Sequence, residues 1–171
     1  MSVEVGKPFP NTTFNYVSYV PESESLTSCG RPGPLDTAKE WSDKTVVLVG
    51  VPGAFTPTCQ ANHIPAFLAK MGDLKAKADV VAIVSANDPF VMSAWGKANG
   101  IKDEILMLCD PNLKWGKQTG YDLDLSSFGI GQRLTRFGMI IKNGTVVYAE
   151  KEPNPSAQPT VSSAENLLSK L

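Results

Sequence analysis

A cysteine stands at the start of a predicted helix, and that position determines what chemistry it can do. In the stretch PGAFTPTC, from Pro52 to Cys59, Thr56 can cap a helix whose first residue is Pro57, so Cys59 is the third helical residue. The sulfur would then lie near unpaired backbone N–H groups at the positive end of the helix dipole, which favours the nucleophilic thiolate. The alternative is a small buried residue at a helix start, because cysteine is among the most buried residue types.

The single histidine of the chain, His63, follows Cys59 by four residues, so helix geometry places both on one face. A Cys-His nucleophile pair, as in a hydrolase or an acyltransferase, is therefore one candidate chemistry. The sequence offers no evident third residue to orient the histidine, and a side chain one turn deeper is poorly placed to reach the sulfur. We therefore interpret His63 as a supporting residue of the pocket.

The rest of the chain predicts the elements that must position these residues. Three buried strands, at 45–51, 79–85 and 105–110, alternate with helices: one that contains Cys59, one at 89–100 and a short one within 111–120. Pro65 should kink or split the helix after Cys59, Asn143-Gly144 should turn a hairpin, and Ser162 should open a last helix with a capping box. Residues 1–44 predict turns and short extended pieces. This order predicts one three-layer α/β/α domain, residues 1–171, with a central mixed sheet.

Composition excludes several classes of protein. Lys and Arg total 16 against 17 Asp and Glu, without a basic run, so we expect no nucleic-acid partner. The longest apolar stretch is about half a membrane span and the N-terminus resembles no secretory signal, so we expect no membrane partner. Cys29, Cys59 and Cys109 form no CxxC pair, which leaves no zinc-site spacing, and no nucleotide motif or cofactor signal is present. Cys109 ends an apolar run and is predicted to be a buried core thiol.

Three separated blocks of sequence occur in the order of a known family. They read PGAFTPTC at residues 52–59, NDPFVMSAWGKANG at 87–100 and RLTRFGM at 133–139. The chain resembles the peroxiredoxins, specifically the five-class or type II branch of alkyl hydroperoxide reductases, whose active-site pattern is Pro-x-x-x-Thr-x-x-Cys. The resemblance covers essentially the whole chain, and it implies a thioredoxin-like fold.

The resemblance also implies a role for each residue of the site. Cys59 would be the peroxidatic cysteine, whose thiolate attacks hydrogen peroxide or an alkyl hydroperoxide and becomes a sulfenic acid. Thr56 would offer its hydroxyl to the peroxide, Arg136 would donate to the sulfur and the substrate oxygen, and Pro52 would shield the sulfur from water. Thr56 could instead be a plain helix cap and Arg136 a solvated strand-end charge, with Arg133 the nearest competitor for the role of Arg136.

A sulfenic acid must be resolved before further peroxide oxidises it irreversibly. Some members of the branch carry a resolving cysteine before the final helix, where this chain has Val161. Cys29 lies in a Ser/Gly/Pro loop, as in a fungal subgroup that the chain resembles. This implies a disulfide between Cys29 and Cys59 of the other subunit of a homodimer, reduced by thioredoxin. The alternative is an uninvolved Cys29, with glutathione or glutaredoxin as the reductant.

The last three residues, Ser169-Lys170-Leu171, match the peroxisomal import tripeptide. We therefore expect recognition by a peroxisomal import receptor and a location in the peroxisome, with a cytoplasmic share. A non-catalytic redox sensor or holdase that uses the same thiol is a further alternative. That alternative predicts slow peroxide turnover despite a reactive Cys59.

Overall fold

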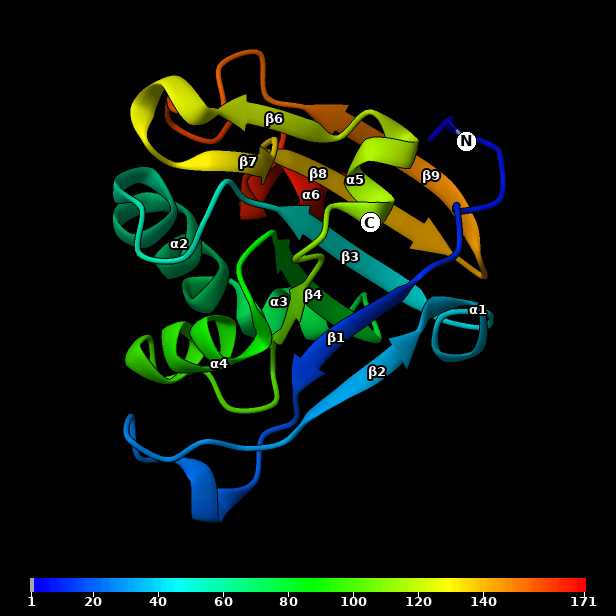
Figure 1. The fold of residues 1–171 in the computed structure, drawn as a ribbon. Coiled ribbons are helices and arrows are strands. Elements are labelled where there is room, and N and C mark those ends of the chain that lie inside the picture. The colour runs from blue at the N-terminus through cyan, green and yellow to red at the C-terminus, as the bar shows by residue number, and fades with distance from the viewer. Residues whose placement is uncertain (1) are drawn as a thin grey trace.

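A seven-stranded mixed sheet forms the centre of the computed structural model, which describes residues 2–171 (Figure 1). Its strand order is β2-β1-β5-β4-β3-β8-β9. The strands of this sheet are β1 (Thr13–Val17), β2 (Pro32–Asp36), β3 (Thr45–Gly50), β4 (Val80–Ser85), β5 (Leu106–Cys109), β8 (Phe137–Lys142) and β9 (Thr145–Lys151). A separate antiparallel pair consists of β6 (Asp122–Leu125) and β7 (Gly131–Leu134). β1 and β2 lie in the region predicted to form turns and short extended pieces, whereas no strand was predicted at β6 or β7.

The predicted thioredoxin-like α/β/α arrangement is confirmed. β3, β4 and β5 run parallel, while β8 pairs antiparallel with β3 and with β9. Helices and helical turns lie between the strands or after the last one: η1 (Pro21–Ser23), α1 (Thr37–Glu40), η2 (Cys59–His63), α2 (Ile64–Ala69), α3 (Met71–Lys75), α4 (Pro89–Ala98), α5 (Lys114–Thr119), η3 (Ser126–Phe128) and α6 (Ala164–Lys170).

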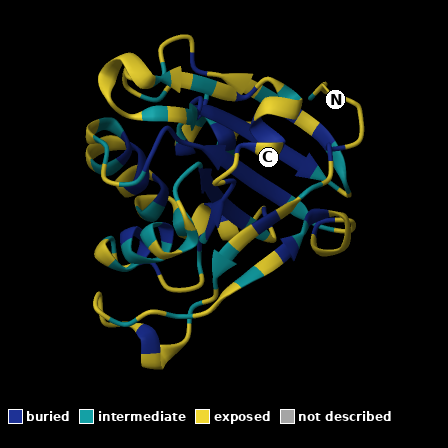
Figure 2. Ribbon diagram, viewed as in Figure 1, coloured by how far each residue is buried: buried dark blue, intermediate teal, exposed yellow. Residues whose placement is uncertain are grey.

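The two faces of the sheet carry separate hydrophobic cores. Along β3, alternate side chains point to opposite faces, so Val47 and Val49 join one core while Val46 and Leu48 join the other. Residues of α2, α3, α4 and α6 cover the first face, and α5 with the aromatic residues of the N-terminal segment covers the second. The central strands are accordingly buried along their length (Figure 2).

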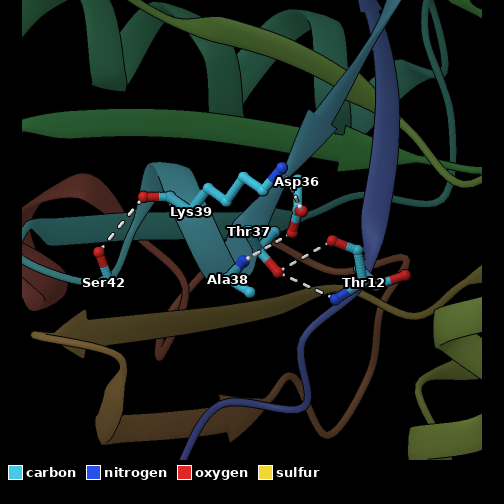
Figure 3. Close-up of polar contacts among 6 residues, drawn as sticks. All are labelled: Thr12, Asp36, Thr37, Ala38, Lys39 and Ser42. Carbon is cyan, nitrogen blue, oxygen red and sulfur yellow. Dashed lines mark hydrogen bonds and ion pairs between the residues drawn. The ribbon is translucent and has the colours of Figure 1, made fainter.

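A short capped helix, α1, follows the N-terminal strands β1 and β2 and contacts the residue just before β1. Thr37 Oγ1 accepts a hydrogen bond from Thr12 N–H and donates one to the Thr12 carbonyl (Figure 3). Asp36 Oδ1 accepts from Ala38 N–H, which caps α1. These bonds fix the end of the β1–β2 pair against α1. The region predicted to form turns and short extended pieces therefore contains an ordered edge of the sheet.

Local turn chemistry decides two further features. Asn143 and Gly144 have φ values of 49° and 73°, as the predicted type I′ hairpin requires. The last helix begins one residue later than predicted: the cap is Ser163, whose hydroxyl accepts from Asn166 N–H. Ser162 cannot serve as the cap because its hydroxyl and its N–H both donate to Glu152.

Candidate active site

The loop after β3 brings Cys59 to the start of a helix. Helix formation starts at Pro57, and the Thr56 carbonyl accepts from Gln60 N–H at 2.9 Å, as predicted for a cap position. The Thr56 hydroxyl does not cap the helix; it donates to the Gly53 carbonyl at 2.8 Å. Its oxygen lone pairs therefore remain for a donor outside the helix. Phe55, just before Thr56, has a φ of 58°, a conformation that costs free energy in a residue other than glycine.

Cys59 opens a π-helical turn rather than a regular α-helix. In η2 the Ile64 N–H reaches back five residues to the Cys59 carbonyl. Pro65 follows in the first turn of α2 and has no N–H to offer. The predicted interruption at Pro65 is thus present, and it takes the form of a widened turn, a feature that is frequent at functional sites.

Arg136 lies against the sulfur. Its side chain, 1% exposed, comes from the residue before β8, and its Nη2 donates to Cys59 Sγ at 3.2 Å. Nη1 bonds to His63 Nδ1 at 2.9 Å, and Nε donates to the Pro155 carbonyl at 2.9 Å. Within residues 2–171 no ion pair includes Arg136. Burial of a cation is costly unless its N–H groups are hydrogen-bonded, and here the sulfur of Cys59, a ring nitrogen of His63 and a backbone carbonyl accept from the guanidinium.

His63 is fixed as a neutral ring. Its Nε2 lies 2.9 Å from the Ser162 carbonyl, which can only accept, so Nε2 carries the proton and Nδ1 accepts from Arg136. Burial, together with the charge of Arg136, lowers the pKa of His63 to about 4. With both ring nitrogens engaged and little tendency to take a proton, His63 is unsuited to act as a base for Cys59. This geometry argues against a Cys-His hydrolase.

Arg133, the sequence competitor of Arg136, supports the loop instead. Its Nη1 donates to the Pro52 carbonyl at 3.4 Å and its Nε to the Ile130 carbonyl at 3.0 Å. Pro52 is buried beside this contact. A Cβ on Gly53 would lie 2.8 Å from Arg133 Nη1, so the guanidinium packs closely against this glycine. Arg133 therefore fixes the loop, and Arg136 is the arginine that contacts the sulfur.

A pocket of about 250 Å³ includes Arg136 in its lining, while the Cys59 side chain itself is fully buried. Thr56 and Pro52 also line it, so the three residues predicted to surround the sulfur border one cavity. Another part of the lining is apolar. It consists of side chains from the β6–β7 pair and the loop that joins the two strands, namely Leu123, Leu125 and Ile130. The cavity therefore combines hydrogen-bonding groups with an apolar wall.

The other two cysteines are placed differently. Cys109 is buried, its thiol donates to the Asn15 carbonyl at 2.8 Å, and burial raises the pKa of the thiol to about 12, which confirms the predicted core thiol. Cys29 is exposed in the loop between η1 and β2, and all three cysteines are free. Lys97 of α4 holds this loop by donating to the carbonyl of Ser28 at 2.9 Å. In Figure 1, α4 lies between this loop and α2.

Sequence reasoning missed a third wall of the site, the segment between β9 and α6. The carbonyl groups of Pro155, Ser156 and Ser162 accept hydrogen bonds from Arg136, Thr58 and His63, respectively. Carbonyl groups are present in every residue, so no side-chain pattern could have pointed to them. The apolar wall did have a signal, because the alternation Asp122-Leu-Asp-Leu125 is typical of a half-buried strand.

Within residues 2–171, no helix combines the length and the apolar character needed to cross a membrane, and no cluster of three or more His, Cys, Asp or Glu side chains could hold a metal ion. A buried cysteine at a helix start, bound by an arginine from the neighbouring strand of a thioredoxin-like fold, defines a thiol-based redox protein.

Comparisons with known proteins identify the family. The Redoxin family model matches residues 4–168. A protein of Lipomyces kononenkoae whose name includes "peroxisomal peroxiredoxin" is 50% identical, covering 84% of this chain and 88% of its own. Peroxiredoxin AHP1 of Chaetomium thermophilum is 45% identical, covering 86% and 83%. The structure of reduced Prx3 from Vibrio vulnificus in complex with H2O2 is 38% identical, with a TM-score of 0.83 and 98% of both chains covered. The chain belongs to the peroxiredoxin family and is a peroxidase, an oxidoreductase.

Proposed function

We propose that Cys59 reduces hydrogen peroxide and alkyl hydroperoxides by direct attack of its thiolate on the peroxide bond. The S–O bond forms as the O–O bond breaks, which oxidises the sulfur to a sulfenic acid. The departing oxygen takes a proton and leaves as water or an alcohol. The observation that carries this proposal is the bond from the buried Arg136 Nη2 to Cys59 Sγ, made by a guanidinium that forms no ion pair within residues 2–171.

The remaining pocket residues have roles that follow from their donors and acceptors. The Thr56 hydroxyl donates to Gly53, so its oxygen is available to accept the O–H of the peroxide. Arg136 stabilises the negative charge as it passes from the sulfur to the two oxygens, since it keeps its own charge throughout. Pro52 limits the access of water to the sulfur. The apolar wall of the pocket suits the alkyl group of an organic hydroperoxide.

We further infer that Cys29 resolves the sulfenic acid. Its sulfur would attack the Cys59 sulfur and form a disulfide with loss of water, and a thioredoxin dithiol would then reduce that disulfide. The exposure of Cys29 supports this role, and the burial of Cys109 leaves no competitor. The position of the Cys29 loop beyond α4 favours a disulfide to the second subunit of a homodimer (Figure 1). Glutathione or glutaredoxin replaces thioredoxin if Cys29 is not involved.

The name of the Lipomyces kononenkoae relative and the tripeptide Ser169-Lys170-Leu171 support a peroxisomal share of this activity, beside a cytoplasmic one. Ser169 and Lys170 are exposed on α6. An import receptor reads this tripeptide where it ends a protein.

Peroxide consumption with a thioredoxin system tests the proposal. Cys59→Ser should abolish turnover, Cys29→Ser should abolish thioredoxin-dependent turnover while leaving one equivalent of peroxide consumed, and Cys109→Ser should be close to wild type. A non-reducing gel should show a peroxide-dependent dimer band that needs both Cys29 and Cys59. Full thioredoxin-dependent turnover by the Cys29→Ser protein would refute the resolving role, and turnover without Cys59 would refute the proposal as a whole.

A further inference from the structure

A buried carboxylate closes the segment between β9 and α6 on itself. Glu152, only 5% exposed, directly follows β9. Its Oε1 accepts from the N–H of Thr160 at 2.7 Å and from the N–H and hydroxyl of Ser162 at 2.8 and 2.7 Å. Its Oε2 accepts from the Thr160 hydroxyl at 2.7 Å. Four donors from two residues thus join the two ends of residues 152–162, which we name the Glu152 loop.

The Glu152 loop presents its backbone to the reactive groups. The Pro155 carbonyl accepts from Arg136 Nε, and the Ser162 carbonyl accepts from His63, whose other ring nitrogen bonds to Arg136. The Glu152 N–H also donates to the Arg136 carbonyl. The loop therefore fixes the arginine at its main chain and at two of its three guanidinium nitrogens. The third nitrogen, Nη2, is left for Cys59.

The packing of the loop against β8 leaves little room for movement. A Cβ on Gly138 would lie 2.9 Å from Ser162 Cα and 3.1 Å from the Val161 carbonyl oxygen, so the loop backbone rests directly on the strand that follows Arg136. Burial opposes ionisation of Glu152, but the hydrogen bonds from Ser162 and Thr160 outweigh it and lower the pKa of the carboxyl. The Glu152 carboxyl group is therefore ionised at neutral pH.

We propose that Glu152 is a positioning residue for the peroxidase reaction: by closing its loop, it holds the carbonyls that aim Arg136 at Cys59. The inference rests on the proposed function, because it concerns the arginine that stabilises the transition state. Glu152 does not line the pocket. It acts through Pro155, Ser162 and His63, and its effect depends on hydrogen-bond geometry rather than on charge near the sulfur.

Two substitutions separate geometry from charge. Glu152→Ala leaves the donors of Thr160 and Ser162 unpaired and opens the loop. Glu152→Gln keeps Oε1 for its three donors, and its amide can donate to the Thr160 hydroxyl, so the loop stays closed without the charge. Glu150→Ala is the matched control, since Glu150 is an exposed glutamate on β9, two residues before Glu152.

The readout is the ratio of two rate constants of reduced Cys59 in single-turnover experiments, one with H2O2 and one with iodoacetamide. Alkylation needs an accessible, ionised sulfur, whereas peroxide reduction also needs Arg136 in register with both oxygens. We expect Glu152→Ala to lower the H2O2 rate constant by about 100-fold and the ratio by at least about tenfold, as for a misplacement of about 1 Å. Glu152→Gln and Glu150→Ala should keep the ratio within about threefold of wild type.

A purely structural role would lower both rate constants together and leave the ratio unchanged, which would overturn the inference. Equal losses in the Gln and Ala proteins would also overturn it, because geometry would then not be the cause. If Glu152→Ala does not fold, the double variant Thr160→Val, Ser162→Ala removes two of the four donors, and a wild-type ratio there would be equally decisive. A wild type that reacts with H2O2 no faster than a free thiol would refute the proposed function along with the inference, whereas a fast wild type with an unchanged Glu152→Ala ratio refutes the inference alone.

Discussion

Replacing His63 with Gln should remove part of the loss of folding stability at acid pH, namely the part that arises because the imidazole is buried. In the folded protein the ring is neutral, donating to the Ser162 carbonyl and accepting from Arg136. Gln offers a carbonyl oxygen to accept from Arg136 and an N–H to donate to the Ser162 carbonyl, and it does not titrate. The two proteins should therefore have free energies of unfolding within about 1 kcal/mol of each other at pH 7.5.

The size of the effect follows from the two pKa values of His63. The ordinary value is 6.5, and burial lowers the pKa in the folded protein to about 4. Between these values the unfolded chain binds more protons than the folded one, so the stability falls as the pH falls. Linkage gives a loss of about 2 kcal/mol between pH 7.5 and pH 5, and about 3 kcal/mol once the pH reaches the folded value.

Urea unfolding at fixed protein concentration, with the cysteines kept reduced, measures this difference at pH 7.5, 6.5, 5.5 and 5. Other titrating groups contribute equally to both proteins, so the difference between the two curves isolates His63. The free energy of unfolding of the His63→Gln protein should fall less than that of wild type by about 2 kcal/mol at pH 5. Parallel curves over this range would show that the folded histidine takes a proton as readily as the unfolded one, which the bonding of both ring nitrogens does not allow.

Three further substitutions test the site and the core. Arg136→Lys should lower the second-order rate constant for H2O2 by about 100-fold, because an ammonium lacks the planar fork whose Nη1 and Nη2 bond separately to His63 and Cys59; a loss below tenfold would contradict this. Thr56→Val should lower the same constant at least about 30-fold while Thr56→Ser stays within about fivefold, since only the hydroxyl is needed. Gly50→Ala should cost about 3 kcal/mol of stability, measured by urea unfolding, because its Cβ would lie 1.9 Å from the Phe137 ring; an unchanged midpoint would refute the close packing.

Local sequence signals predicted much of the fold. The β-branched run at residues 45–51 became β3, and Asn143-Gly144 turned the predicted hairpin, because each signal reflects a preference that the chain expresses without distant help. The start of the last helix was misplaced between two adjacent serines of equal capping ability. The choice between them was made by Glu152, ten residues before Ser162, and a local rule cannot include such a partner.

The candidate site divides in the same way. The position of Cys59 after Thr56 and Pro57 follows from capping rules, and the motif resemblance indicated Arg136. The carbonyl partners of that arginine, and the π-helical turn that follows Cys59, depend on backbone geometry that side-chain identity does not encode. The carbonyl partners are recognised only when the segment between β9 and α6 is placed in space, and the π-helical turn only when the backbone after Cys59 is.

The β6–β7 pair belongs to a small sheet of its own, with no ladder to the strands that carry the chemistry. It nevertheless supplies Leu123 and Leu125 to the pocket. Substitutions of Leu123 and Leu125 would therefore change the lining of the pocket without altering a strand pair of the main sheet. Under the proposed function, the selectivity for bulky or small hydroperoxides could then be changed at these two positions while Cys59 and Arg136 are kept.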